Sequence, residues 1–278
     1  MPELPEVEAV RQTLKKLVIS KKIQDVSVLW PNIVRQPDDK NEFISLLKGQ
    51  TIIDIHRRGK FLIFELEDVV LVSHLRMEGK YLVMSSSEEK DAYTHILFHF
   101  EDGTDLRYRD VRKFGTMEIF PKGLENTLPP LNGLGPEPLG KELTVSYLEH
   151  KLRKTSRVIK QVLLDQSVIA GLGNIYVDEV LFQSQIHPTR KASSLTTKEI
   201  SQLVKAIKDV IQRAIEHGGS TIRTYVNSQG KKGSYQDYLL VYGKKEEPCS
   251  RCGHPIEKIK VAQRGTHFCP VCQATQNR

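Results

Sequence analysis

Two Cys-x-x-Cys pairs near the C-terminus restrict the fold of this 278-residue chain more than any other feature. The pairs are sixteen residues apart and contain all the cysteines of the chain, namely Cys249, Cys252, Cys269 and Cys272. Four thiolates with this spacing suit a tetrahedral Zn²⁺ ion with no open coordination position. A thioredoxin-like redox motif needs one pair on a βαβ unit, and a disulfide framework spreads its cysteines over a whole domain. The pattern therefore predicts one structural zinc ion in a C-terminal hairpin.

The charge of the chain is unevenly distributed. Residues 1–140 carry 19 Lys and Arg against 22 Asp and Glu, whereas residues 141–278 carry 22 against 12. The loop between the cysteine pairs adds Lys258, Lys260 and Arg264. A basic half of this size favours a polyanionic partner such as nucleic acid, because neutralised phosphates release counterions. A merely well-solvated basic surface is the alternative.

The hydrophobic pattern changes once along the chain. Apolar residues at helical spacing occupy 3–17 and, briefly, 39–48, while short β-rich runs fill 23–120 and predict an antiparallel sandwich or barrel. Residues 121–140 are rich in Pro and Gly, which marks a domain boundary. Helical patterns follow at 144–153, 156–165, 174–184 and 196–217, and the cysteine-bearing tail from 235 is β-like. The fold class expected is α+β with two domains.

Gly171-Leu172-Gly173-Asn174 joins two of the predicted helices. Glycines permit a tight turn, and Asn174 can cap the helix that follows, whose free N–H groups can hold an anion. Alone, this motif fits a plain helix connection better. Beside a zinc ribbon and a basic domain, it favours a phosphate clamp.

The N-terminus could act as a chemical reagent. Removal of Met1 would leave Pro2 with a free secondary amine, which can attack a sugar C1′, and Glu3 could donate a proton to the opening ring. Many chains begin Met-Pro, so the pair is weak evidence alone. Lys60 enters the apolar run 61–64, where a cation needs a partner such as phosphate. Acids at the start and no apolar run of 18 residues predict no signal peptide and no membrane span, hence a cytoplasmic protein.

Eight motifs together resemble the bacterial formamidopyrimidine-DNA glycosylases, in the same order and across nearly the whole chain. They are MPELPEVE at 1–8, RRGKF at 57–61, SHLRMEG at 73–79, RKFG at 112–115, GLGNIYVDE at 171–179, GGSTIRTYVN at 218–227, LVYGK at 240–244 and the cysteine ribbon. The resemblance implies an N-terminal β-sandwich, a helix–two-turns–helix domain and a zinc finger, with DNA held between the domains. It also implies release of 8-oxoguanine and formamidopyrimidines from duplex DNA, followed by strand cleavage through β,δ-elimination. Domain bounds expected on this basis are 1–132, a linker at 133–143, 144–234 and the finger at 235–278.

The resemblance also carries roles for the reacting groups. Pro2 matches the nucleophile and Glu3 the general acid. Lys60 matches a lysine thought to hold the phosphate at the lesion and to assist elimination. Arg264 matches the arginine assigned to the second elimination and to the phosphate clamp, and no catalytic position departs from the family pattern.

Further positions match residues that contact DNA. Asn174 and Tyr242 match phosphate contacts, His95 matches another DNA-contact position, and Lys160 is also expected to contact DNA. Phe114 is expected to wedge into the base stack, Met77 to fill the space left by the extruded base and Arg112 to bond the orphaned cytosine. The loop expected to close over the extruded base contains Ser220, Thr221, Ile222, Arg223, Thr224 and Tyr225.

Two rival interpretations differ in their predictions. An endonuclease VIII type enzyme, which removes oxidised pyrimidines, typically has Gly in place of Leu4 and lacks the RKFG wedge, so this chain favours the purine enzyme. A zinc-ribbon DNA-binding module without catalysis would lose nothing but affinity if Pro2 were replaced. The partner expected is duplex DNA with an oxidised purine opposite cytosine. The enzyme is expected to act as a monomer and to associate with the nucleoid when bound.

Overall fold

The computed structural model describes residues 1–220 and 233–275, and it divides into two compact units. The first unit comprises Met1–Asn132 and Gly218–Ser234, and the second comprises Gly133–His217 and Tyr235–Arg278. The described residues 218–220 thus belong to the N-terminal unit, although the helix that precedes them belongs to the C-terminal unit. The sequence pattern does not indicate this change of unit. The four-part division expected from the sequence stays a prediction.

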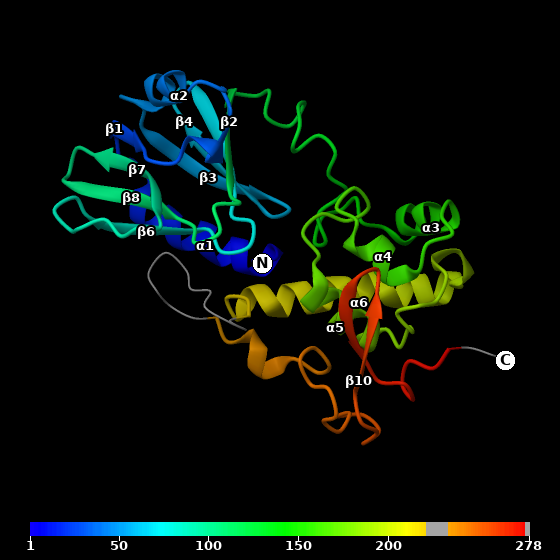
Figure 1. Cartoon of the computed structure of the whole chain (residues 1–278). Helices are drawn as coiled ribbons and strands as arrows, with labels where there is room; N and C mark the ends of the chain where they lie inside the picture. The colour runs from blue at the N-terminus through cyan, green and yellow to red at the C-terminus, as the bar shows by residue number, and fades with distance from the viewer. Residues whose placement is uncertain (221–232, 276–278) are drawn as a thin grey trace. The chain divides into compact units, whose positions relative to one another are not determined.

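The N-terminal unit consists of a β-sandwich and two helices (Figure 1). Its elements in chain order are α1 (Leu4–Val18), β1 (Ile23–Val28), β2 (Val34–Gln36), α2 (Lys40–Leu47), β3 (Ile52–Arg58), β4 (Phe61–Leu66), β5 (Val69–His74), β6 (Lys80–Ser85), β7 (Thr94–Phe100), β8 (Thr104–Arg109) and β9 (Thr116–Pro121), with a short 3-10 turn at Pro31–Ile33.

The strands form two sheets that share one core. One sheet has the order β2-β9-β5-β4-β3 and the other β1-β7-β8-β6. Every neighbouring pair is antiparallel except β2 and β9. Apolar side chains from both sheets and from α1 meet in a single cluster. Within it the rings of Phe64 and Tyr81 lie 5.3 Å apart, and the Tyr81 hydroxyl donates to Ser73 Oγ of the opposite sheet at 2.8 Å. This face-to-face contact makes the unit a sandwich.

The C-terminal unit is helical and carries a small hairpin. Its elements are α3 (Val145–Arg153), α4 (Ile159–Leu164), α5 (Asn174–Gln183), α6 (Thr197–Glu216), the strands β10 (Glu257–Val261) and β11 (Arg264–Phe268), and 3-10 turns at Ala192–Ser194 and Tyr235–Tyr238. Helix α6 begins with a capping box, because Thr196 and Glu199 each bond the other's backbone N–H. Helix α5 is buried on most sides, and its buried residues include two carboxylates, Asp178 and Glu179.

The elements agree with the predicted α+β class, and the exceptions have physical causes. The β-rich runs predicted within 23–120 correspond to β1 and β3–β9, whereas the three-residue β2 shows no alternation that would predict a strand. Helix α4 begins at Ile159 rather than at 156. The backbone before it bonds another segment instead, since the Ala192 N–H donates to the Arg157 carbonyl and the Ile159 N–H donates to the Arg190 carbonyl. No helix in the described part of the chain is both long enough and apolar enough to cross a bilayer.

Candidate active site

The first turn of α1 is tied to the start of the predicted lesion loop by one carboxylate. Pro2 and Glu3 are buried at the head of the helix. The Glu3 N–H donates to Glu6 Oε2 at 2.7 Å, and the Ser220 N–H donates to Glu6 Oε1 at 2.7 Å. Gly219 has a φ of +77°, and a Cβ there would lie 2.6 Å from Glu6 Oε1. Buried Glu6 therefore positions the predicted nucleophile and acid relative to residues 219–220. The other loop residues named above, Thr221 to Tyr225, lie outside the described residues.

A second carboxylate organises the turn that precedes Lys60. Arg57 Nε donates to Glu8 Oε2 at 3.0 Å, and Arg57 Nη1 donates to the Gly59 carbonyl at 2.9 Å. Burial acts to raise the pKa of Glu8, but hydrogen bonds from Arg11 and Gln12 outweigh it and lower the pKa. Glu8 is therefore ionised at neutral pH and fixes the turn between β3 and β4. Lys60, which follows that turn, is 6% exposed.

The surroundings of Lys60 are electropositive. His74, at the end of β5, accepts the Arg76 N–H on Nδ1 at 2.9 Å. Burial, together with the charges of Arg76 and Lys60, lowers the pKa of His74 to about 3. His74 is therefore neutral, and the positive charge here belongs to Lys60 and Arg76. Met77, half-buried, follows in the same loop.

Arg112 and Phe114 project from the loop between β8 and β9. The Phe114 side chain is 51% exposed, and the Arg112 guanidinium lies 4.7 Å from the centre of its ring. His95 is buried instead, and its Nε2 lies 2.8 Å from the Asp110 carbonyl oxygen. The structure thus places the predicted wedge at the surface and His95 beneath the loop that carries it.

In the C-terminal unit, Asn174 bonds the backbone of the residue that follows Arg264. Asn174 is the first residue of α5, and its Nδ2 donates to the Gly265 carbonyl at 2.9 Å. Arg264 begins β11 and is exposed. Glu179 accepts the N–H groups of residues 240, 241 and 242, each at 2.9 Å, and so fixes the backbone of Tyr242. Helix α5 therefore holds the backbone of Gly265, beside Arg264, through Asn174 and the backbone of Tyr242 through Glu179.

Lys160 lies in the interior of this unit, not at its surface. Its side chain has no solvent exposure, and its Nζ lies 2.6 Å from Asp178 Oδ1 and 3.3 Å from the Gly265 carbonyl. The other oxygen of Asp178 accepts the His267 N–H at 2.8 Å. A direct DNA contact by Lys160 stays a prediction, and its position favours support of the turn at Gly265.

The four cysteines form one cluster at the base of the β10–β11 hairpin. Their Sγ atoms all lie within 4.8 Å of one another. Backbone N–H groups donate to two of the sulfurs, from Arg251 to Cys249 and from Cys272 to Cys269, each at 3.4 Å. Such bonds stabilise thiolates, so the donor set fits a closed structural zinc site.

Comparison with known proteins agrees with this arrangement. The Formamidopyrimidine-DNA glycosylase N-terminal domain matches residues 1–117, its H2TH domain matches residues 134–226, and the zinc finger found in FPG and IleRS matches residues 246–275. The chain is 58% identical over 273 residues to Formamidopyrimidine-DNA glycosylase of Bacillus cereus, covering 98% of this chain and 99% of that protein. The chain belongs to the formamidopyrimidine-DNA glycosylase family. It is therefore an enzyme, a DNA glycosylase and abasic-site lyase with a single structural zinc.

Solved structures of another family member match this chain along their whole length. The complex of Lactococcus lactis Fpg with DNA containing an abasic site superposes with a TM-score of 0.91 at 45% identity, covering 98% of this chain and 100% of that chain. A complex of a Lactococcus lactis FPG variant with Fapy-dG DNA gives a TM-score of 0.92 at 45% identity, covering 99% and 100%.

Five buried carboxylates that hold the family's motifs in place were not among the site residues predicted from the sequence. They are Glu6, Glu8, Asp110, Asp178 and Glu179. The signal available was their position inside or beside motifs, as in MPELPEVE and GLGNIYVDE. A carboxylate in an apolar helix such as α5 needs donors around it, and this requirement could have identified Asp178 and Glu179.

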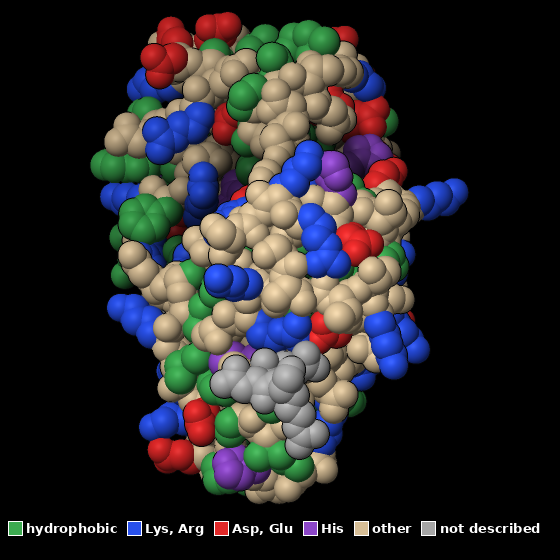
Figure 2. Space-filling model, turned by 90° about the vertical axis from the view of Figure 1, so that its right-hand side faces the viewer, with side chains coloured by type: hydrophobic (Ala, Val, Ile, Leu, Met, Phe, Trp, Pro, Cys, Tyr) green, Lys and Arg blue, Asp and Glu red, His purple; other side chains and the backbone are tan. Residues whose placement is uncertain are grey.

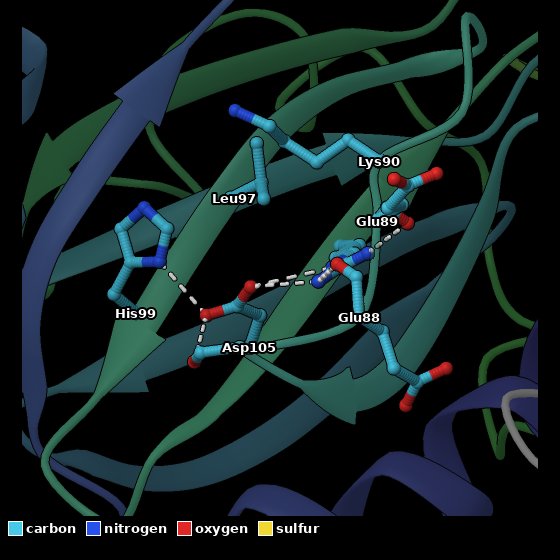
Figure 3. Close-up of a pocket in the computed structure, with 8 residues that line it drawn as sticks. Glu88, Glu89, Lys90, Leu97, His99 and Asp105 are labelled. Carbon is cyan, nitrogen blue, oxygen red and sulfur yellow. Dashed lines mark hydrogen bonds and ion pairs between the residues drawn. The ribbon is translucent and has the colours of Figure 1, made fainter.

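A pocket on the four-stranded sheet of this glycosylase contains no predicted site residue (Figure 3). The buried charges at its centre, Asp105 and Arg107, are paired with each other. Asp105 accepts from His99 Nδ1 at 2.8 Å and from Arg107, which also donates to the Ser85 and Glu88 carbonyls. The network fastens the acidic stretch 85–91 to β8 through the Ser85 and Glu88 carbonyls. Elsewhere, Lys and Arg side chains are spread over the face shown in Figure 2.

Proposed function

We propose that this enzyme removes oxidised purines, 8-oxoguanine and formamidopyrimidines, from duplex DNA through a Schiff base on Pro2, and then cuts the strand by β,δ-elimination. The observation that carries the proposal is the placement of Pro2 and Glu3 at the head of α1, beside the carboxylate that also bonds Ser220. The complexes of Lactococcus lactis Fpg with abasic-site DNA and with Fapy-dG DNA support it by similarity.

The chemistry begins with the amine of Pro2 after Met1 has been removed. Its lone pair forms a bond to C1′, and the bond from C1′ to the base breaks. The damaged base leaves with the electron pair and takes up the proton that the positively charged Pro2 nitrogen loses. The C1′–O4′ bond then opens, O4′ takes a proton from Glu3, and an iminium forms between Pro2 and C1′. Glu3 is 3% exposed, so it is shielded from bulk water.

Strand cleavage follows from the acidity of the iminium. Loss of a C2′ proton expels the 3′ phosphate, and loss of a C4′ proton then expels the 5′ phosphate. Water finally hydrolyses the iminium and frees Pro2. Lys60 holds the phosphate at the lesion, and Arg264, fixed by the hairpin turn that Asn174 bonds, assists the second elimination.

Specificity for purines rests on the wedge and on the loop from Ser220 to Tyr225. Phe114 enters the base stack, Met77 fills the space of the extruded base and Arg112 bonds the orphaned cytosine. Lactococcus lactis Fpg has also been solved with DNA containing an oxidised pyrimidine, so lesion preference needs a direct comparison of the two classes. The partner is duplex DNA, bound by a monomer in the cytoplasm at the nucleoid.

Borohydride reduction tests the proposal. The mature protein with 8-oxoguanine duplex and sodium borohydride should give a covalent protein–DNA adduct, and Pro2→Gly should not. Protein that retains Met1 should bind the duplex without cutting it. The absence of an adduct from mature wild-type protein would leave a zinc-ribbon DNA-binding module as the better interpretation. Faster excision of oxidised pyrimidines than of 8-oxoguanine would favour the endonuclease VIII type.

A further inference from the structure

The loop that carries Arg112 and Phe114 is built around the side chain of Asp110. This carboxylate is 1% exposed, directly after β8. Its Oδ1 accepts the Arg112 N–H at 3.0 Å, and its Oδ2 accepts the N–H groups of Phe114 at 2.9 Å and Gly115 at 2.8 Å. Both oxygens are therefore used to hold the backbone on either side of the exposed wedge.

The backbone of Asp110 is fixed from the other direction. Its N–H donates to the Tyr93 carbonyl at 3.0 Å, and its carbonyl oxygen accepts the Lys113 N–H at 3.2 Å and lies 2.8 Å from His95 Nε2. The His95 carbonyl in turn accepts the Leu29 N–H at 2.8 Å. The carboxylate thus acts from a residue that is itself anchored to the sheet.

The loop has a conformation that it would not keep without support. Lys113 has a φ of +58°, in the left-handed region that non-glycine residues avoid. Gly115 allows close approach of Tyr108, because a Cβ would lie 1.6 Å from the Tyr108 hydroxyl oxygen. Burial and the Asp110 charge raise the pKa of Tyr108, so this hydroxyl keeps its proton. The result is an exposed apolar ring on an ordered backbone, which lowers the entropy cost of insertion into DNA.

We infer that Asp110 is the positioning residue of the wedge: its two carboxylate oxygens hold Phe114 and Arg112 in the arrangement that opens the base stack at a lesion. This inference rests on the proposed function, because it assigns Asp110 to the search and extrusion step that precedes attack by Pro2. Asp110 is buried and its carboxylate bonds backbone N–H groups of its own loop, so we expect the abasic-site reaction, which needs no base extrusion, to depend on it far less.

Asp110→Asn tests the inference with nearly unchanged shape. The amide keeps one acceptor oxygen and places an NH₂ donor against backbone N–H groups. Single-turnover excision of 8-oxoguanine should fall about tenfold or more, while cleavage of a preformed abasic site stays within about threefold. Equal loss of both activities, or of neither, would overturn the inference.

A double-mutant cycle with Phe114→Ala separates positioning from a general effect. If Asp110 acts through the wedge, Asp110→Asn should slow excision little further in the Phe114→Ala background. Full additivity of the two losses would contradict the inference. Wild-type protein that forms no borohydride adduct would instead refute the proposed function, so the two failures can be told apart.

Asp105→Asn is the matched control. Asp105 is also a 1% exposed carboxylate on β8, but its partners are Ser86, His99 and Arg107 (Figure 3). This variant should lower the melting temperature without changing the ratio of excision to abasic cleavage, and a changed ratio would overturn the inference. Should Asp110→Asn fail to fold, His95→Asn removes the ring contact to the Asp110 carbonyl and keeps the carboxylate. It should reduce the same ratio, and an unchanged ratio would contradict the role of the loop.

Discussion

Lys160 Nζ and Asp178 Oδ1 are 2.6 Å apart in an ion pair from which solvent is fully excluded. The pair joins α4 to α5, and through the Gly265 carbonyl and the His267 N–H it also joins both helices to the zinc hairpin. Because this hairpin carries Arg264, the ion pair links the stability of the C-terminal unit to its proposed grip on phosphate.

Asp178→Asn should therefore cost both stability and affinity. It leaves the Lys160 charge buried without its counterion, which lowers the free energy of unfolding by about 3–5 kcal/mol. Urea unfolding measures the first effect, and titration of abasic-site duplex measures the second. Glu247→Gln is the control, because Glu247 pairs with Lys244 at an exposed site and should contribute less than about 1 kcal/mol. Equal losses from the two variants would contradict the buried network.

Gly219→Ala should reduce borohydride trapping by more than the strain of its backbone conformation alone would cause. Gly219 and Gly103 have φ values of +77° and +78°, so alanine costs roughly 1 kcal/mol of backbone strain at either site. A Cβ at Gly219 would also meet the Glu6 carboxylate, whereas nothing lies within 4 Å of one at Gly103. We expect Gly219→Ala, but not Gly103→Ala, to reduce borohydride trapping. Similar trapping by both variants would show that the Glu6 contact is dispensable.

His74 should make stability depend on pH in a defined window. The folded state keeps His74 neutral down to a pKa of about 3, whereas the unfolded state binds a proton below about 6.5. The unfolded state therefore holds more protons between these values. The free energy of unfolding therefore rises with pH across that window, by up to about 1.4 kcal/mol per pH unit, and is level above it. His74→Asn, whose amide oxygen can still accept the Arg76 N–H, should flatten the slope between pH 5 and 7. Parallel stability curves would refute the assignment.

Removal of zinc should weaken DNA binding and leave the core of the N-terminal unit intact. Cys252→Ser removes one of four ligands, so metal content measured by mass spectrometry and DNA affinity should fall together. The zinc finger and β11, with Arg264, would lose their anchor while the sandwich keeps its own cluster. Tight DNA binding by a zinc-free variant would contradict the scaffold role.

Salt dependence checks the phosphate contacts as a group. Affinity for abasic-site duplex should fall steeply as salt rises, since each neutralised phosphate releases counterions. Arg264→Ala should reduce the slope of log affinity against log salt by about one unit. A slope that does not change would remove Arg264 from the phosphate clamp.

Local patterns in the chain were sufficient for the zinc ligands, the sandwich strands, the long helices and the family, because each depends on spacing or order along the sequence. Cysteine spacing defines a metal site by itself, and alternation or helical periodicity defines an element by itself. The placement of Lys160 could not be obtained this way, since a lysine in the sequence looks the same whether it faces phosphate or a buried Asp178 on another helix. The role of Glu6 was hidden for the same reason, because folding brings it the distant Ser220 N–H. Asp110 bonds N–H groups only a few residues along the chain, but the sequence does not show that its loop folds back onto the carboxylate. The sequence alone thus determined which residues are available for chemistry. The tertiary structure decided which buried carboxylates hold them in place, because a hydrogen bond depends on distance in space and not on distance along the chain.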